Sequence, residues 1–109
     1  MDKQDWKLYE LKAEVLQAMA HPIRLAILDL LKDGEVCVCD IASRIGAQRS
    51  NVSRHLSVML KAGVVEVRKD GLRMLYTLRT PCVLKFVSCV ADVLHAKVES
   101  EAATLRRQR

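Results

Sequence analysis

Hydrophobic residues in the first half of the chain recur every three or four positions, the spacing that places side chains on one face of an α-helix. The pattern predicts four helices: residues 5–19, a helix that begins at Pro22 and stops near Asp33-Gly34, residues 38–45, and a fourth helix closed by Gly63. Proline suits the first position of a helix, and a glycine commonly follows the last, as Gly46 does after the third. The first half of the chain is therefore predicted to be a succession of short helices.

The fourth helix has the clearest division between an apolar and a polar face. Its apolar residues fall at i, i+4, i+7 and i+8 and are predicted to form one buried stripe: Val52, Leu56, Met59 and Leu60. The opposite face is polar and carries two arginines: Arg49, Ser50, Ser53, Arg54 and Ser57. One side of this helix is thus expected to pack and the other to meet solvent or a polar partner.

The spacing changes after Gly63. Two runs rich in β-branched and apolar residues, 64–68 and 72–78, flank Lys69-Asp70-Gly71 and predict a β-hairpin with its turn at Asp-Gly. Pro81 is expected to open a last helix whose apolar face carries Val83, Phe86, Val87, Val90 and Leu94. The tail, residues 106–109, is predicted to fray.

Composition narrows the class of protein. At 109 residues the chain is expected to be one domain, small enough for dimerisation to add needed buried surface. The net charge of +5 favours a polyanionic partner such as nucleic acid. The charged N-terminus is followed by no secretory signal, and residues 82–94 are too short to span a bilayer, so a cytoplasmic protein without a membrane partner is predicted.

A short helix, a tight turn at residues 46–48 and a helix with a cationic face form the order of a helix-turn-helix, and a following hairpin makes it a winged helix. The predicted fold is therefore mainly α with a β-hairpin wing: one winged helix-turn-helix domain over residues 1–109, dimerising through its terminal helices. The residues expected to contact double-stranded operator DNA are Gln48, Arg49, Ser50, Asn51, Ser53, Arg54, His55, Arg68, Lys69 and Arg73. His55 borders the apolar stripe, so packing explains it as well as DNA contact does.

Four cysteines in a reducing compartment are candidates for metal ligands, redox thiols or small core residues: Cys37, Cys39, Cys82 and Cys89. Cys37 and Cys39 stand close together at the start of the third helix, where thiolates suit soft metal ions. Residues two apart on a regular helix point about 200° apart. Both therefore bind one ion only if the first turn is unwound or Cys37 lies outside it. Cys82 and Cys89 lie too far apart on one helix to share an ion. Two alternatives stay open: antiparallel last helices of a dimer bring Cys82 of one chain near Cys89 of the other, or one of these cysteines completes the site of Cys37 and Cys39.

Four segments of the chain resemble the ArsR/SmtB family: residues 20–28 (AHPIRLAIL), 37–42 (CVCDIA), 51–56 (NVSRHL) and 62–65 (AGVV). The resemblance covers about residues 8–95. It implies a dimeric winged-helix repressor that leaves its operator when a metal or metalloid binds. It also implies thiolate ligands at Cys37 and Cys39, which match the family's Cys-Val-Cys-Asp motif.

The chain departs from the family's known ligand sets. Ala42 replaces the third cysteine of the local arsenic site, no cysteine precedes Cys37, and the zinc ligands of the last helix are not all present. As(III) or Sb(III) is the expected inducer, bound by Cys37, Cys39 and either Cys82 or Cys89, with Cd(II), Pb(II) or Zn(II) as alternatives. Asp92, His95 and Glu99 share one face of the last helix, and a polar surface explains them as well as a zinc site does.

Two further hypotheses stay open: a repressor controlled by thiol oxidation or persulfidation, and a constitutive DNA-binding protein with structural cysteines. A disulfide between residues as close as Cys37 and Cys39 would be strained, which favours metalloid binding over oxidation. The sequence offers no glycine-rich phosphate loop and no nucleophile placed beside a base, so no enzyme is predicted.

Overall fold

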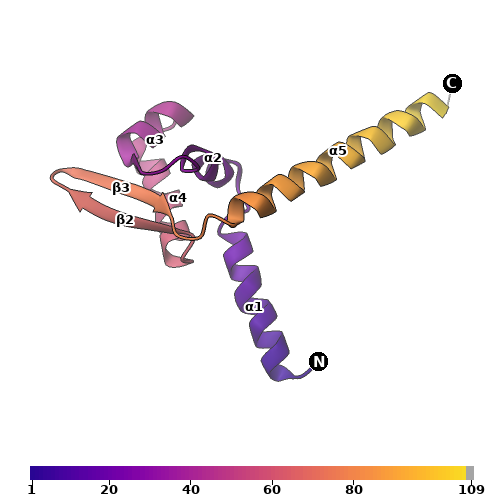
Figure 1. The fold of residues 1–109 in the computed structure, drawn as a ribbon, viewed down its shortest axis with the longest axis horizontal. Helices are drawn as coiled ribbons and strands as arrows, with labels where there is room; N and C mark the ends of the chain where they lie inside the picture. Colours follow the sequence, from indigo (N-terminus) through magenta and orange to yellow (C-terminus); the bar gives the residue numbers. More distant parts are fainter. Residues whose placement is uncertain (108–109) are drawn as a thin grey trace.

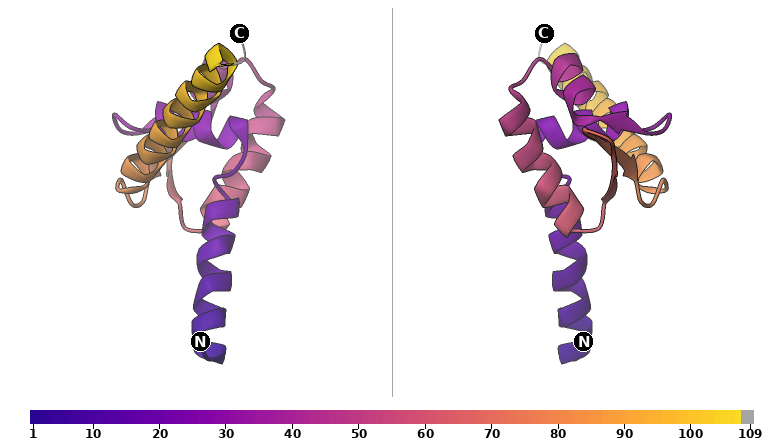
Figure 2. Two further views of the ribbon diagram at one scale, coloured as in Figure 1. Left: turned by 90° about the vertical axis from the view of Figure 1, so that its right-hand side faces the viewer. Right: turned by 90° about the vertical axis from the view of Figure 1, so that its left-hand side faces the viewer.

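The computed structural model describes residues 1–107 (Figure 1). The elements in chain order are α1 (Lys3–Gln17), α2 (Pro22–Leu30), β1 (Val36–Cys37), α3 (Val38–Ile45), α4 (Arg49–Lys61), β2 (Val65–Asp70), β3 (Arg73–Leu78) and α5 (Val83–Arg107). The predicted helical first half and the hairpin are confirmed. Helices α2, α3 and α4 pack together beside the sheet, whereas α1 and α5 lead away from it (Figures 1 and 2).

The core forms where α2, α3 and α4 meet the first residues of β2. Ile27, Ile41 and Val52 are fully buried there, as are Leu56 and Met59. The predicted stripe of α4 is therefore confirmed except at Leu60, which is 40% exposed. Leu60 lies about 80° around the helix from Val52, at the edge of the stripe, where its side chain meets solvent.

Local capping interactions set the ends of the helices, and in α1 and α2 these ends differ by a few residues from those that the apolar pattern predicts. α1 begins at Lys3 and not at residue 5, because Asp2 caps it and forms a reciprocal capping box with Asp5. α2 begins at Pro22 as predicted but ends at Leu30, three residues before the expected stop. α3 ends as predicted at Gly46, whose φ of +79° is the left-handed conformation that suits glycine.

The sheet has three antiparallel strands in the order β1-β3-β2. β1 was not predicted, because two residues are too few to show an alternating pattern, and its pairing partner lies almost 40 residues away: Cys37 pairs with Leu75. In the hairpin Asp70 pairs with Arg73, so the loop is Gly71-Leu72 and not Asp-Gly. Gly71 has a φ of +62° and Leu72 has no positive φ, which is the pattern of a type II′ turn.

α5 begins at Val83, two residues after the predicted start. Pro81 and Cys82 form the preceding turn, and the Cys82 carbonyl accepts the amides of Lys85 and Phe86. Arg106 and Arg107 are helical, so fraying is wrong for them; residues 108 and 109 lie outside the described part of the chain.

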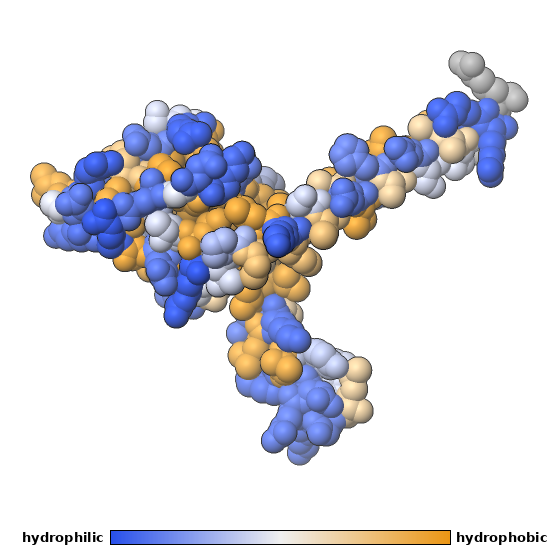
Figure 3. Space-filling model, viewed as in Figure 1, coloured by the Kyte–Doolittle hydropathy of each residue, from blue (hydrophilic) through white to orange (hydrophobic). Residues whose placement is uncertain are grey.

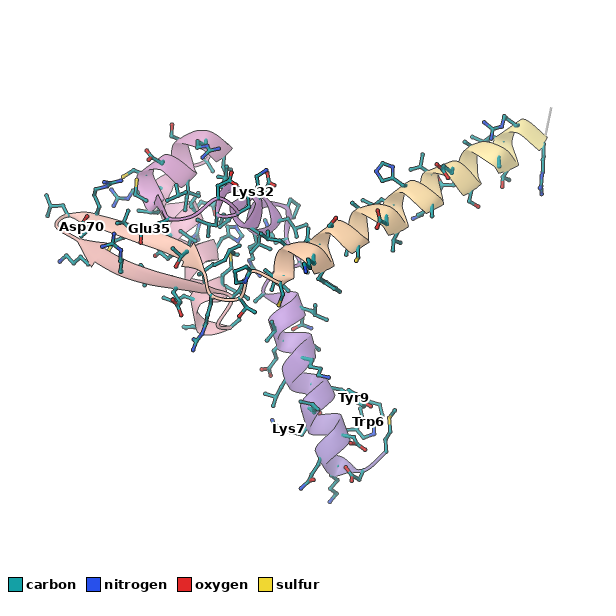
Figure 4. All side chains as sticks on the ribbon, in the orientation of Figure 1. Trp6, Lys7, Tyr9, Lys32, Glu35 and Asp70 are labelled. Carbon is teal, nitrogen blue, oxygen red and sulfur yellow. The ribbon has the colours of Figure 1, made fainter. Side chains whose placement is uncertain are left out.

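The apolar faces of α1 and α5 are largely uncovered where these two helices extend from the domain. No described residue of α1 or α5 is buried, and Trp6 on α1 and Leu94 on α5 are both 58% exposed. Trp6 and Tyr9 make an edge-to-face pair, with ring centroids 5.8 Å apart, on the same side of α1 (Figure 4). The radius of gyration is 17.6 Å, against about 13 Å for a compact chain of this length. Figure 3 shows hydrophobic surface concentrated where the two helices leave the domain.

Candidate nucleic-acid interface and thiol site

The first two turns of α4 gather most of the predicted DNA-contacting residues on one face. Arg49, Ser50 and Arg54 are exposed, and Asn51 and Ser53 are half-buried. Arg54 Nη2 lies 3.5 Å from Asn51 Oδ1, so the two side chains stand together. A helix with exposed arginine, serine and asparagine side chains can enter the major groove, where these groups reach base edges and phosphates.

Gln48 is the N-cap residue of α4. Its backbone is extended, with φ −67° and ψ 141°, and its side chain makes no capping hydrogen bond. The side-chain amide of Gln48 is therefore not engaged in capping α4, and Gln48 directly precedes Arg49. The left-handed Gly46 sets the tight turn that brings α3 and α4 together, so this end of α4 is positioned by the backbone of the turn.

One of the three hairpin cations predicted to contact DNA, Arg68, is held by a carboxylate of the same chain. Arg68 donates two hydrogen bonds to the Glu35 carboxylate, at 2.6 and 2.7 Å, from a position where its side chain is still 59% exposed. The same pair lowers the pKa of Glu35. Glu35 lies against the sheet whose tip carries Asp70 (Figure 4). Lys69 is exposed near that tip, whereas Arg68 links the wing to the segment before β1.

Arg73 is an exposed residue of β3 that lies on the same side of the sheet as Cys37. Cys37 pairs with Leu75, and Arg73 lies two residues along β3 on the same face. The pKa of Arg73 is raised, chiefly by hydrogen bonding to the Cys37 sulfur and further by the charges of Asp40 and Asp70. The structure therefore brings Arg73 to the thiol site, an association that no spacing in the sequence reveals.

His55 lies in a packed cluster behind the exposed face of α4. Its Nδ1 accepts a hydrogen bond from Arg24 Nε at 3.1 Å, and its ring centroid lies 4.3 Å from that of His21. His21 caps α2 by accepting the Ile23 amide at Nδ1. Arg24 was missed as a partner of His55, because a contact between residues 31 positions apart leaves no local pattern.

Cys37 and Cys39 meet the geometric condition set for a shared ligand. Cys37 is the N-cap residue of α3, with extended φ −77° and ψ 154°, and so lies outside the helix. Its side chain makes no capping hydrogen bond and is 7% exposed, whereas Cys39, in the first helical turn, is exposed. The 200° separation of two residues within one regular helix therefore does not apply to this pair.

The other two cysteines are both exposed. Neither is a core residue of the protomer, so the packing alternative is wrong for Cys82 and Cys89 here. Cys82 precedes the first residue of α5, and only Cys89 belongs to the regular helix. Among residues 1–107, no three or more His, Cys, Asp or Glu side chains of one protomer converge on a metal-sized site. The donor set of one protomer thus fits two thiolate ligands and does not by itself supply a third.

None of the described helices combines the length and apolar character needed to cross a membrane.

The family model for "Bacterial regulatory protein, arsR family" matches residues 21–67, from the cap of α2 into β2. An uncharacterized HTH-type transcriptional regulator of Mycobacterium tuberculosis is 36% identical over 90% of this chain and 87% of that protein. The arsenical resistance operon repressor of Staphylococcus xylosus is 33% identical over 64% of this chain and 67% of that protein.

Solved structures agree with these relatives. The solution structure of a homodimeric winged helix-turn-helix DNA-binding domain from Mycobacterium bovis, a possible ArsR-family transcriptional regulator, aligns with a TM-score of 0.78 and 31% identity, over 92% of this chain and 93% of that domain. The observed helices and strands, the segment that the family model matches and the share of the chain that the relatives cover all indicate the same family. The chain belongs to the arsR family of bacterial regulatory proteins, whose winged helix-turn-helix members are DNA-binding regulators of transcription and not enzymes.

Proposed function

We propose that this chain is a homodimeric transcriptional repressor of the cytoplasm that holds operator DNA and releases it when As(III) or Sb(III) binds its cysteine thiolates. The observation that carries the DNA-binding part is the polar, cationic first half of α4, exposed beside the hairpin wing. Gln48, Arg49, Ser50, Asn51, Ser53 and Arg54 are the proposed contacts in the major groove. Lys69 is the wing cation best placed for a flanking phosphate.

The dimer is proposed to form through α1 and α5, as terminal extensions of one domain over residues 1–109. Both helices expose apolar side chains that the small core leaves uncovered, among them Trp6, Phe86 and Leu94. A second copy of the chain offers the same faces, and a two-fold axis pairs them. The homodimeric domain from Mycobacterium bovis, which aligns over 92% of this chain, supports this arrangement.

The inducer site is proposed at Cys37 and Cys39. The buried sulfur and the exposed sulfur flank the start of α3, outside and inside its first turn. Trivalent arsenic and antimony favour thiolate sulfur and bind three such ligands. The third thiolate is proposed to come from Cys82 or Cys89, either by movement within the protomer or from the partner of the dimer. The arsenical resistance operon repressor among the relatives supports this class of inducer.

Helix α3 connects the proposed inducer site to α4, the proposed DNA-reading helix. Val38, Ile41 and Ala42 of α3 are buried in the core that also holds Val52 of α4. Drawing the sulfurs of Cys37 and Cys39 onto one ion shifts the first turn of α3, and α4 rests on that helix. Release follows only if the ligand binds the DNA-free conformation more tightly than the DNA-bound one.

Divalent Cd(II), Pb(II) or Zn(II) is the second candidate class of inducer. The observation that favours it is that only two of the four thiols, those of Cys37 and Cys39, stand at the start of α3, because these ions also accept oxygen ligands such as water beside sulfur. Persulfidation is the third candidate signal, and the exposed thiols of Cys39, Cys82 and Cys89 are accessible to it. Titration of the reduced protein on DNA separates the three.

The DNA-binding part is tested with Arg54→Ala. A duplex is first selected from a random-sequence library with the wild-type protein at neutral pH, and its affinity is then measured by fluorescence anisotropy over a range of salt. We expect weaker binding of this duplex and a salt slope reduced by about one unit per protomer, because one phosphate contact is lost. Arg106→Ala, which removes the same charge from the far end of α5, should change neither quantity. An affinity and slope equal to wild type would remove Arg54 from the contact surface.

A further inference from the structure

The histidine–arginine cluster, formed by His21, Arg24 and His55, joins three helices at one point. His55 belongs to α4, and its Nδ1 accepts from Arg24 Nε of α2 at 3.1 Å. Arg24 Nη1 also donates to the Gln17 carbonyl, the last residue of α1, at 3.1 Å. The guanidinium therefore ties the proposed DNA-reading helix to the end of the proposed dimerisation helix.

Both histidines of the cluster use Nδ1 as an acceptor. His21 Nδ1 accepts the Ile23 amide at 3.1 Å and so caps α2, while its ring lies 4.3 Å from the ring of His55. A neutral imidazole has one acceptor nitrogen, and a protonated one has none. Protonation of His55 therefore removes the acceptor for Arg24 and places a second cation against the guanidinium.

The charges around the cluster are mostly positive. From α2, His21 and Arg24 face His55, and from α4 itself Arg54 does. Burial, followed by these three groups, lowers the pKa of His55. Glu14 of α1 and Lys61 of α4 line the open pocket of about 390 Å³ beside Arg24, so the carboxylate that lines this pocket is matched by a lysine. The surroundings therefore oppose a charged His55.

We propose that His55 is a positioning residue whose neutral ring holds α4 at the angle needed for operator binding, so that protonation of His55 weakens the complex. This inference rests on the proposed operator binding and adds a dependence on pH to it. A dimer reads two half-sites whose spacing is fixed by how each recognition helix is held relative to the dimer axis. The tie from His55 through Arg24 to Gln17 is the polar link between those two parts of the protomer.

The sign of the effect separates this role from direct DNA contact. A requirement for neutral His55 lowers operator affinity as the pH falls through the pKa of His55. The loss at pH 5.5 would be about tenfold per protomer for a histidine with the ordinary pKa near 6.5, and the lowered pKa of His55 makes that figure the upper limit. A histidine that touched phosphate would do the opposite, because its positive charge would strengthen binding on acidification. A packed residue with no part in positioning would leave the affinity unaffected by its own titration.

The test compares wild type with His55→Asn, whose side-chain oxygen keeps an acceptor near the place of Nδ1 but does not titrate. Affinity for the selected duplex is measured between pH 7.5 and 5.5. We expect the wild type to lose up to about tenfold more affinity per protomer than His55→Asn. His95→Asn, which removes an exposed histidine of α5 outside the cluster, should keep the wild-type pH dependence. Equal declines in wild type and His55→Asn, or tighter wild-type binding at pH 5.5, would overturn the proposal.

A second measurement uses the wild-type protein alone and so does not depend on whether a variant folds. Nuclear magnetic resonance titration of the His55 ring in the wild-type protein gives its pKa in the free and the DNA-bound states, and we expect a lower value in the complex. An unchanged or higher value in the complex would overturn the positioning role. Absence of sequence-selective binding at pH 7.5 is a different outcome, since it would contradict the proposed function and the inference with it.

Discussion

Replacing either cysteine at the start of α3 will leave the repressor on its DNA when arsenite is added. Cys37→Ser and Cys39→Ser should bind the selected duplex as the wild type does, because serine is a favoured N-cap residue and Cys37 makes no capping hydrogen bond that could be lost. Wild-type affinity should fall by about a hundredfold on arsenite binding, equivalent to a coupling free energy of about 3 kcal/mol. Both variants should show almost none of this fall in anisotropy titrations under reducing conditions.

The same titration identifies the third ligand. One of Cys82→Ser and Cys89→Ser should behave as Cys37→Ser does, because two thiolates leave a trivalent ion one ligand short. Ser43→Ala, on the exposed side of α3, is the matched control and should release DNA normally. Release of DNA by Cys37→Ser and Cys39→Ser at wild-type arsenite concentrations would show that the inducer site lies elsewhere.

A carboxylate at the centre of the exposed face of α5 will separate the protomers. Leu94 is 58% exposed in the protomer and is proposed to be covered in the dimer. Removing a buried leucine side chain costs about 2 kcal/mol, and a two-fold interface contains the substitution twice. Leu94→Asp should therefore weaken dimerisation at least about a thousandfold, and sedimentation velocity should show monomers that bind the selected duplex poorly.

Leu94 is a cleaner test than Val90, because Val90 also lines an apolar groove of about 320 Å³ with Leu16 and Met19 of its own chain. Ser88→Asp introduces the same charge on the polar side of α5, about 120° around the helix from Leu94. It should leave the dimer intact. A wild-type monomer at micromolar concentration, or a dimer of Leu94→Asp as tight as wild type, would contradict the proposed interface.

Much of the fold could be predicted because local rules determine it. The helix over residues 38–45 follows from its apolar spacing and from Gly46, and the structure has the same bounds. The hairpin follows from two apolar runs around a glycine. The predicted family is confirmed, since its motifs in residues 21–67 include both helices of the helix-turn-helix.

Contacts between distant residues could not be predicted in this way. β1 exists because Cys37 pairs with Leu75, and two residues carry no period of their own. Arg68 pairs with Glu35, a residue 33 positions away, and this ion pair leaves no local pattern in the sequence. Arg73 lies beside Cys37 because the strand pairing decides which face of the wing it occupies.

Contacts with a partner chain are the second kind of contact that could not be predicted from the sequence. The apolar stripes of α1 and α5 were predicted, but within one protomer only the start of α5 packs against the core, and no described residue of either helix is buried. Cys82 and Cys89 were weighed as core residues and are both exposed. Periodicity identifies a face that needs a partner, and it does not say whether the partner is the same chain or a second copy.

Operator release by the reduced wild-type dimer is the most direct test of a thiol-controlled repressor. The protein is held on the selected duplex and titrated separately with arsenite, antimonite, cadmium, lead, zinc and a persulfide donor. We predict release by arsenite and antimonite at stoichiometric concentrations, with little effect of zinc. Release by the divalent ions or the persulfide donor alone would contradict the proposed inducer, and full retention of DNA with all six would contradict control through the thiols.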